Sequence, residues 1–181
     1  MDRGTQAETL ERVLWLFGLP GAGKSTIGDA AAEILELKGV KCARLDGDVL
    51  RTGLCRDLGF SGQDRAENLR RAAHVAKYVS EIPCPVIATF ISPLESDRAL
   101  VRAILGSNGV LVWVKTALSE CVRRDPKGMY AKASRGEIAE FTGISSPFEE
   151  PVQFDGVLDT SAASAEQLAS SLLEEFLFRS R

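Results

Sequence analysis

A glycine-rich segment directly after a short apolar run most restricts what this chain folds into. Residues 18–26, GLPGAGKST, match the pattern G-x-x-x-x-G-K-[ST], and residues 13–17, VLWLF, form the apolar run before them. In such a strand–loop–helix unit, successive backbone N–H groups and the helix N-terminus point at an anion. We therefore expect the loop to bind nucleotide phosphates, with Lys24 on the β- and γ-phosphates and Ser25 as a ligand of Mg²⁺. The predicted nucleotide-binding residues are Gly18, Leu19, Pro20, Gly21, Ala22, Gly23, Lys24, Ser25 and Thr26.

Strand-length apolar runs alternate with helical patterns along the whole chain. The runs cover residues 13–17, 40–45, 85–91, 109–114 and 157–158. Their continuous apolar character is typical of strands that are buried on both faces. Because strand–helix alternation implies right-handed crossovers, the expected fold is α/β, a P-loop NTPase and kinase fold with a five-stranded parallel sheet, helices on both faces and a lid segment. Ligands of such sheets bind at the C-terminal ends of the strands.

Capping residues predict where the helices begin and end. Ser61, Ser92 and Ser164 each precede a helical pattern and have an acid or amide at the third following position. A proline follows Ser92 at the expected first helical position, so we predict that Ser92 caps the next helix. Gly39 and Gly106 stand where two of the helices should end.

The length of the chain predicts one domain over residues 1–181, because this many residues bury a complete core without disulfides or metals. Residues 1–11 are expected to form a flexible arm. Between residues 125 and 154 the apolar periodicity fades in a charged, glycine-containing stretch that is too long for a connector. We therefore assign residues 123–154 to a lid and to acceptor-binding loops.

The charge balance excludes a broad basic surface. The chain has 22 Lys and Arg against 25 Asp and Glu, a formal net charge of −3, so it is not expected to bind nucleic acid or an anionic membrane. Any anion site must be local. The N-terminal residues lack the apolar stretch of a signal peptide and no apolar run is long enough to span a bilayer, so we expect a cytoplasmic protein.

Cysteine and histidine content excludes two further classes of site. Cys42, Cys55, Cys84 and Cys121 form no C-x-x-C pair, and His74 is the single histidine of the sequence. Zinc hydrolases and Ser-His-Asp enzymes are therefore excluded. We expect the cysteines to be small buried or half-buried apolar residues in a reducing compartment.

The residues around the phosphate-binding loop favour a small-molecule kinase over a GTPase. The sequence has no N-K-x-D motif for reading guanine, and the third predicted strand ends in Ile91 and Ser92 rather than in an acidic residue. The nearest acidic pair is Asp46 and Asp48, at the end of the second predicted strand. This position suits a small-molecule kinase, in which a carboxylate faces the hydroxyl group of the acceptor.

Longer strings outside the loop resemble the adenylyl-sulfate kinase family, also called adenosine 5′-phosphosulfate (APS) kinase. They are LDGDVLR at residues 45–51, GLCRDLGFSGQDRAENLRR at 53–71, FISP at 90–93, RRDPKGMYAKA at 123–133 and FTGISSPFEEP at 141–151. The resemblance implies transfer of the γ-phosphoryl group of ATP to the 3′-hydroxyl of APS, which gives PAPS and ADP in sulfate assimilation. It also implies ATP and Mg²⁺ as cofactors, a homodimer and a functional link to ATP sulfurylase.

The same resemblance assigns acceptor-binding roles to residues outside the loop. Arg51, Arg65 and Asn68 would hold the phosphosulfate group and the ribose, since paired guanidinium donors match such oxygens. Phe60 and Phe141 would sandwich the acceptor adenine. The remaining acceptor-binding residues that the resemblance implies are Asp48, Ile91, Ser92, Lys127, Gly128 and Met129.

The expected catalytic residues are Lys24, Asp46, Asp48, Lys127 and, in one of two interpretations, Ser92. Asp46 is expected to hold a Mg²⁺-bound water or to accept the hydroxyl proton, with Asp48 close by. Lys127 resembles the lysine that reaches the acceptor and the transferred phosphoryl group, and Arg124 is expected to cover the ATP base. Ser92 either caps a helix and contacts the acceptor, which we favour because direct transfer needs no intermediate, or becomes a phosphoserine.

Departures from the family pattern leave two alternatives open. The departures are Phe17, Pro20, Val49, Met129 and Phe148, together with entry to the third strand through Pro83, Cys84 and Pro85. The first alternative is a related kinase for another nucleotide-linked acceptor, such as a cytidine nucleotide. The second is a non-catalytic module that senses PAPS or another nucleotide, although a pure binder would not need to keep Lys24, Asp46 and Lys127.

Overall fold

The computed structural model describes residues 12–178, and its strands form one parallel sheet. The strands are β1 (Val13–Phe17), β2 (Ala43–Asp46), β3 (Val86–Phe90), β4 (Gly109–Lys115) and β5 (Gly156–Asp159), in the spatial order β2-β3-β1-β4-β5. Every neighbouring pair in this order is parallel. The predicted α/β fold with a five-stranded sheet is therefore confirmed. The predicted flexible arm, residues 1–11, lies outside the described residues.

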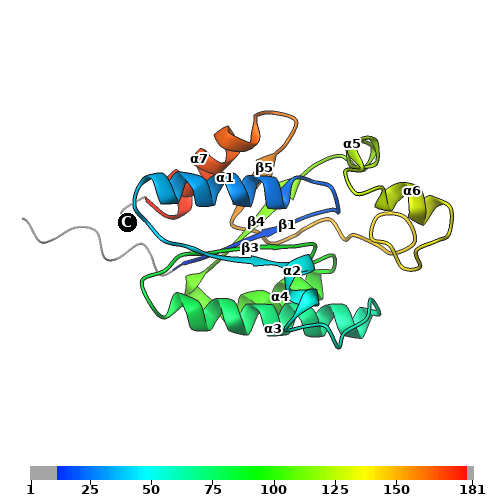
Figure 1. The fold of residues 1–181 in the computed structure, drawn as a ribbon, viewed down its shortest axis with the longest axis horizontal. Coiled ribbons are helices and arrows are strands. Elements are labelled where there is room, and N and C mark those ends of the chain that lie inside the picture. Colours follow the sequence, from blue (N-terminus) through cyan, green and yellow to red (C-terminus); the bar gives the residue numbers. More distant parts are fainter. Residues whose placement is uncertain (1–11, 179–181) are drawn as a thin grey trace, which may run out of the picture.

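Two pairs of long helices cover the two faces of the sheet (Figure 1). Helix α1 (Lys24–Leu37) packs with α7 (Ala165–Phe176) on one face, and α3 (Gly62–Ser80) packs with α4 (Glu95–Leu105) on the other. A short 3₁₀ turn (Gly106–Asn108) leads from α4 into β4. After β1 the chain crosses towards β2, whereas after the neighbouring β4 it crosses towards β5 on the opposite side of the sheet. The loop after β1 therefore lies at a switch point of the sheet, which is where such sheets bind ligands.

Three short helices follow the C-terminal ends of strands. They are α2 (Gly47–Thr52), which directly follows β2, and α5 (Leu118–Arg124) and α6 (Met129–Ser134), which come after β4 and extend to the right in Figure 1. The phosphate-binding loop also follows the C-terminal end of a strand, so the loop and these helices lie at the same end of the parallel sheet.

Side chains of β1 divide the core into two clusters. Leu14 and Leu16 pack on the α1–α7 side, while Val13, Trp15 and Phe17 pack on the α3–α4 side. All of these side chains are fully buried. Burial on both faces explains why residues 13–17 contain no polar side chain and form the most recognisable strand of the sequence.

Most of the predicted helix ends are confirmed. Ser61 accepts a hydrogen bond from the backbone N–H of Asp64 at the start of α3, and Ser164 caps α7 together with the side chain of Gln167. Gly39 and Gly106 follow α1 and α4 with φ values of +73° and +61°. Those are left-handed conformations that glycine adopts at little cost.

The predicted capping role of Ser92 is wrong. Helix α4 begins at Glu95, its N-cap is Leu94, and the carboxylate of Asp97 accepts the N–H of Leu94. The hydroxyl of Ser92 instead accepts a hydrogen bond of 3.0 Å from the indole N–H of Trp15. A buried indole needs such a partner, and this need turns the serine side chain towards the sheet and away from the helix.

Two short helices and one strand boundary differ from the sequence prediction. Helix α2 starts immediately after Asp46, whose carboxylate accepts the N–H of Asp48, and β2 begins at Ala43 rather than at residue 40. Helix α6 lies inside the segment in which no helix was expected, and the carboxylate of Asp125 accepts two of its backbone N–H groups. Each of these helices has six residues, too few for a hydrophobic period to be recognisable.

The predicted burial of the cysteines is confirmed, and their thiols are free. Cys55 and Cys121 are buried, and Cys42 and Cys84 are half-buried. None of the helices between residues 12 and 178 combines the length and the apolar character needed to cross a membrane.

Candidate active site

The loop between β1 and α1 has the backbone conformation of a phosphate-binding loop. Gly18, Gly21 and Gly23 have φ values of +152°, +72° and +97°. A Cβ atom on Gly18 would lie 2.5 Å from the carbonyl oxygen of Val114, so no side chain fits there. Because Gly23 is the N-cap of α1 and Thr26 lies in its first turn, the N–H groups at the start of α1 face the mouth of the loop.

Lys24 is held against this loop by hydrogen bonds to its backbone. Its Nζ atom donates to the carbonyl oxygens of Gly18 at 2.9 Å and Leu19 at 2.7 Å, and its side chain is buried. Burial lowers the pKa of Lys24 to about 8, although the nearby thiol of Cys121 and the carboxylate of Asp46 act in the opposite direction. The positive charge of Lys24 is buried and is compensated only in part by nearby negative charge. Such an ammonium group binds phosphate strongly.

Asp46 is the centre of a hydrogen-bond network that joins three elements. Its Oδ2 atom accepts the hydroxyl of Ser25 from α1 at 2.8 Å and the hydroxyl of Thr89 from β3 at 2.7 Å, and its Oδ1 atom accepts the N–H of Asp48. Partial burial raises the pKa of Asp46, but these hydrogen bonds outweigh that effect and hold the pKa below its ordinary value. Asp46 is therefore ionised at neutral pH.

The donor set of Ser25 and Asp46 fits Mg²⁺. The ion prefers oxygen ligands and is usually held by one or two protein oxygens together with substrate phosphates and waters. Here a hydroxyl and an ionised carboxylate lie 2.8 Å apart at the mouth of the phosphate-binding loop. Among residues 12–178 no cluster of three His, Cys, Asp or Glu residues could hold a metal ion by itself.

Lys127 connects the segment between α5 and α6 to α2. Its Nζ atom lies 2.5 Å from the Oδ2 atom of Asp48, and this contact raises the pKa of Lys127. Gly128 follows with a φ value of +64° and forms the N-cap of α6. The pair brings the predicted lid residue Lys127 and the predicted acceptor-binding residue Asp48 together.

Helix α6 is anchored on the phosphate-binding loop by Tyr130. The phenolic hydroxyl of Tyr130 donates to the carbonyl oxygen of Pro20 at 2.9 Å, and its ring packs edge-on against Phe141 with centroids 4.9 Å apart. Met129 packs, half-buried, against the same core cluster. Helix α6, in the segment predicted as a lid, therefore contacts both the phosphate-binding loop and one of the two predicted adenine-binding aromatics.

The predicted acceptor residues surround the loop that leads into α3. Arg65 donates to the carbonyl oxygen of Phe60 and the hydroxyl of Thr142, and a third contact reaches the carbonyl oxygen of Glu140. Arg51 lies with its guanidinium carbon 4.5 Å from the centre of the Phe60 ring. The ring of Phe60 is exposed while that of Phe141 is buried, so only Phe60 is open for stacking before a ligand arrives.

Asn68 has an unsatisfied polar atom that points to a ligand. The residue lies one turn after Arg65 on α3 and is 5% exposed, and its buried Oδ1 atom has no hydrogen-bond partner among the described residues. A buried carbonyl oxygen without a partner costs about 1–3 kcal/mol. The cost is recovered if a ligand hydroxyl donates to this oxygen, which agrees with the predicted ribose contact.

Ile91 and Ser92 directly follow β3, beside the start of the phosphate-binding loop. The backbone carbonyl of Ile91 accepts the N–H of Gly18 at 3.2 Å, and Ser92 has the left-handed φ value of +43°. Ser92 is 1% exposed, and its carbonyl oxygen accepts a hydrogen bond from the buried Arg98. The serine is therefore held rigidly, and both its acceptor contact and its covalent role stay predictions.

Arg124 is linked to the phosphate-binding loop through Thr160. It donates to Glu120 and to the hydroxyl of Thr160, whose methyl group is the nearest neighbour of a Cβ placed on Gly23. Thr116 in turn links Thr160 to the carbonyl oxygen of Ala22. Arg124 is thus next to the loop that is predicted to hold the donor phosphates.

Three contact residues were not identified in the sequence. Thr89 lies opposite Asp46 in the parallel register of β2 and β3, so the strand order would have revealed it. Tyr130 lies in the DPKGMY string and Thr142 in the FTGI string, but no local pattern distinguishes them from their neighbours.

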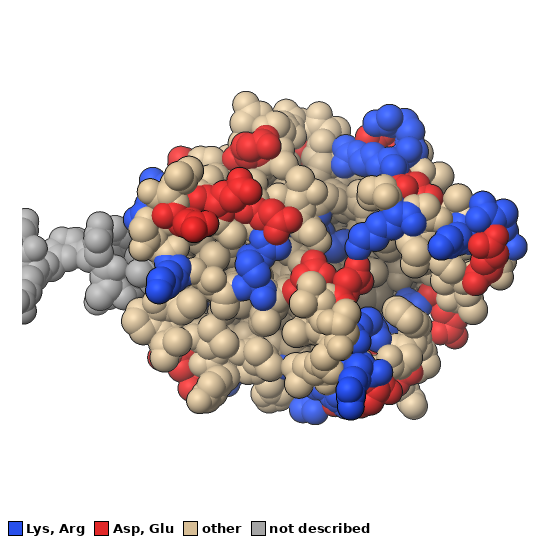
Figure 2. Space-filling model, in the orientation of Figure 1, with Lys and Arg blue, Asp and Glu red and all other residues tan. Residues whose placement is uncertain are grey.

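Charged side chains gather around this end of the molecule. Figure 2 shows Lys and Arg over the regions of α5 and α6 and over the start of α3, with a hollow and several acidic side chains between them. The net charge of −3 therefore conceals a local cationic surface. A surface of this kind attracts anionic ligands.

Comparison with known proteins identifies one family. The profile of the family described as adenylylsulphate kinase matches residues 11–159. The adenylyl-sulfate kinase of Bacillus licheniformis is 49% identical over 163 residues, which cover 90% of this chain and 83% of that protein. The adenylyl-sulfate kinase of Shewanella amazonensis is 45% identical over 174 residues, which cover 96% of this chain and 88% of that protein.

A solved structure agrees with these sequence matches. The APS kinase of Mycobacterium tuberculosis in complex with AMPPNP and APS superposes with a TM-score of 0.85 at 42% identity. The superposition covers 90% of this chain and 95% of that chain.

Proposed function

This chain belongs to the adenylylsulphate kinase family, and from this membership and the site geometry we propose that it transfers the γ-phosphoryl group of ATP to the 3′-hydroxyl of APS. The products are PAPS and ADP, and the reaction serves sulfate assimilation. The chain is accordingly a phosphotransferase with an alcohol group as acceptor.

The proposal rests on one observation: residues of the donor side and residues of the acceptor side both contact the neighbouring carboxylates Asp46 and Asp48. On the donor side, Ser25 of the phosphate-binding loop contacts Asp46 at 2.8 Å. On the acceptor side, Lys127 contacts Asp48 at 2.5 Å, and Arg51 lies one turn after Asp48 on α2. A triphosphate on the loop and an anionic acceptor beside the arginines therefore meet at this carboxylate pair.

The transfer is mainly a matter of positioning and charge neutralisation. The acceptor 3′-oxygen forms a bond to the γ-phosphorus while the bond from that phosphorus to the β–γ bridging oxygen breaks, and ADP leaves with the electron pair. Lys24 and the N–H groups of the loop stabilise the negative charge of the donor phosphates. Lys127 leaves Asp48 for the transferred phosphoryl group, and the freed Asp48 carboxylate accepts the hydroxyl proton.

Asp46 is better placed for a metal than for the proton. Three hydrogen bonds already hold its carboxylate in the ionised form, which makes it a weak base. We assign Ser25 as a direct ligand of Mg²⁺ and Asp46 as a contact through a bound water. When bound, the ion neutralises charge on the β- and γ-phosphates.

The residues assigned to the acceptor lie in two segments, one around α2 and the start of α3 and the other around Phe141. Arg65 joins these segments through its contacts with Glu140 and Thr142. Arg51, Arg65 and Asn68 are assigned to the phosphosulfate group and the ribose, and Phe60 and Phe141 to the two sides of the adenine. The orphaned oxygen of Asn68 supports a hydroxyl-bearing ligand. On the donor side, Arg124 is assigned to the ATP base.

A coupled assay of ADP formation tests the proposal. ADP should form with APS as acceptor and stop when Mg²⁺ is chelated. Cytidine nucleotides and gluconate serve as competing acceptors, and faster ADP formation with either would make the chain a kinase of another acceptor. Tight PAPS binding without ADP formation at saturating ATP and APS would make it a sensing module.

We also propose a homodimer that works in the cytoplasm with a separate ATP sulfurylase. The dimer is implied by the family resemblance, and the free thiols agree with a reducing compartment that supplies ATP. Light scattering should give twice the chain mass of 19.5 kDa. A mass of one chain at micromolar concentration would contradict the dimer.

A further inference from the structure

The loop of residues 53–60 has little packing to hold it in place. It links α2 to α3 and ends at Phe60, the candidate stacking partner of the acceptor adenine. The side chain of Phe60 is 65% exposed, and Cys55 is the fully buried side chain of the loop. The position of Phe60 therefore depends on contacts that hold the backbone of the loop.

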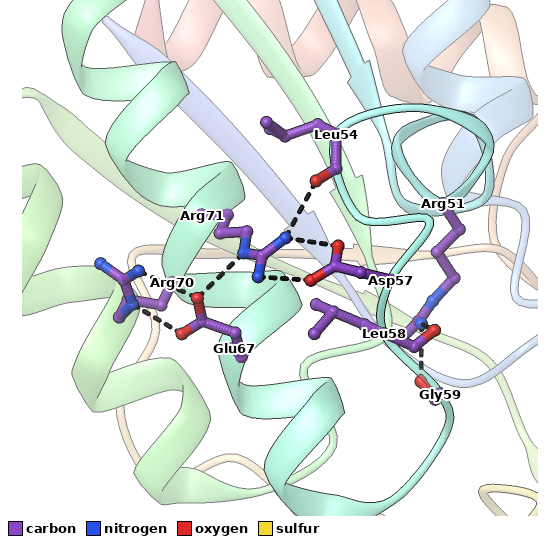
Figure 3. Close-up of polar contacts among 8 residues, drawn as sticks. All are labelled: Arg51, Leu54, Asp57, Leu58, Gly59, Glu67, Arg70 and Arg71. Atoms are coloured by element: carbon purple, nitrogen blue, oxygen red, sulfur yellow. Dashed lines mark hydrogen bonds and ion pairs between the residues drawn. The ribbon is translucent and has the colours of Figure 1, made fainter.

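Three arginines supply such contacts, and Figure 3 shows two of them. Arg51 donates through Nη1 to the carbonyl oxygens of Leu58 and Gly59, at 3.3 and 2.7 Å. Arg65 donates to the carbonyl oxygen of Phe60 at 2.8 Å. Both arginines are candidate ligands of the phosphosulfate group, so an arriving acceptor competes with the loop for their donors.

Arg71 holds the opposite end of the loop with a different geometry. Its Nη1 and Nη2 atoms donate to the two carboxylate oxygens of Asp57 at 2.7 and 2.8 Å, and Nη1 also donates to the carbonyl oxygen of Leu54 at 3.0 Å. This two-pronged pairing fixes direction as well as distance. The contact lowers the pKa of Asp57 and raises that of Arg71.

Glu67 orients Arg71 from within α3. It lies one turn before Arg71 and accepts its Nε–H at 2.9 Å, while it also accepts two hydrogen bonds from Arg70 (Figure 3). Because one edge of the Arg71 guanidinium is held by Glu67, the other edge faces Asp57. Arg70 itself contacts no residue of the 53–60 loop among the described hydrogen bonds.

We propose that Arg71 and Asp57 form a brace that positions the loop of residues 53–60 for the acceptor adenine. Arg71 lies on the same helix as Arg65 and Asn68, so the brace holds Phe60 in one frame with the residues assigned to the phosphosulfate and the ribose. It persists when Arg51 and Arg65 turn to the substrate. This inference rests on the proposed function, and Arg71 is a positioning residue that acts through the loop.

The brace should influence acceptor binding and leave donor binding unchanged. Ordering an exposed loop before binding lowers the entropy lost on association. Loss of the brace should therefore raise the KM for APS about tenfold. The KM for ATP should stay within about twofold, and kcat within about threefold, of the wild-type value. A residue that only stabilised the fold would change all of these parameters together.

The experiment compares Arg71→Met with the matched control Arg70→Met and with Asp57→Asn. Arg70 and Arg71 are neighbours on α3 and both bind Glu67, but only Arg71 reaches the loop. Asp57 belongs to the loop and its side chain is exposed, so its substitution leaves α3 intact. Hydrogen exchange of the amides of residues 54–60 is measured without substrate, and the KM values for APS and ATP are measured by ADP formation.

Faster exchange of residues 54–60 and a raised KM for APS in Arg71→Met and Asp57→Asn, with Arg70→Met unchanged, would support the brace. In the double variant the effects should not add, because both substitutions remove the same contact. Unchanged exchange in Arg71→Met, or an equal rise of both KM values, would overturn it. If the wild type formed no ADP with APS, the proposed function would fail, while the exchange data would still decide whether Arg71 orders the loop.

Discussion

Tyr130 donates its phenolic hydrogen to the carbonyl oxygen of Pro20 over 2.9 Å, and this contact ties α6 to the phosphate-binding loop. The ring is buried between the loop and Phe141, so the hydrogen bond is shielded from water. The segment predicted as a lid is therefore attached to the donor loop by one polar contact. We therefore expect the binding of a donor on the loop and the position of α6 to be coupled through this contact.

Tyr130→Phe should weaken ATP binding without unfolding the protein. The substitution keeps the ring and removes one buried hydrogen bond, which is worth about 1 kcal/mol. We expect the KM for ATP to rise about fivefold. Steady-state kinetics check this, with Tyr78→Phe on the exposed side of α3 as a control that should not change. An unchanged KM for ATP would show that the contact does not serve the loop.

Lys24→Met should lose activity and change the pH dependence of stability. Removing the charge should lower kcat/KM by about a hundredfold, a loss of about 3 kcal/mol in transition-state stabilisation. In the folded protein the pKa of Lys24 is about 8, against an ordinary value of 10.5. The unfolded chain therefore binds more protons between these pH values, and the stability of the wild type rises relative to the variant as the pH increases from 8 to 10.5.

Urea unfolding of the wild type and Lys24→Met between pH 7 and 10 measures the difference between their free energies of unfolding. The titrations of all other groups cancel in this difference because both proteins contain them. The stability of the wild type relative to Lys24→Met should increase by about 2–3 kcal/mol over the range. A difference that stays constant with pH would contradict the lowered pKa of Lys24. Retention of most of the turnover in the variant would contradict the mechanism.

Asp46→Asn should impair catalysis while it preserves the helix that Asp46 begins. Asparagine is as good an N-cap as aspartate, so α2 is expected to form. Losing the charge beside Ser25 should lower kcat at least about a hundredfold and raise the Mg²⁺ concentration needed for half-maximal rate. Mg²⁺ titrations of the wild type and the variant check this. An unchanged Mg²⁺ requirement would remove Asp46 from the metal site.

Ser92→Ala should remain active if transfer is direct. The substitution leaves the indole N–H of Trp15 buried without its partner, which should cost about 1–3 kcal/mol of stability. We expect a lowered melting temperature and a kcat within about tenfold of the wild type. Incubation with radiolabelled ATP should leave no phosphoryl group on the wild-type protein. Labelled protein that is lost in the alanine variant would establish the phosphoserine route.

Local sequence was sufficient for the elements with strong short-range signals. The apolar run of β1, the glycines after it, and the capping serines at residues 61 and 164 all lie within a few residues of the structure they specify. Ser92 failed as a cap because its local pattern competed with a partner 77 positions away, the indole of Trp15. The short helices α2 and α6 were missed because their caps, not their periodicity, define them.

Fold class, phosphate-binding loop and family could all be predicted from the sequence, because each depends on residues that are adjacent or regularly spaced along the chain. Which side chains meet could be seen only in the folded protein. Folding brought Thr89 and Ser25 to one oxygen of Asp46, Tyr130 to Pro20, and Arg71 to Asp57. Such contacts depend on strand order and on helix placement, which are set by burial of the two core clusters and leave no local mark in the sequence.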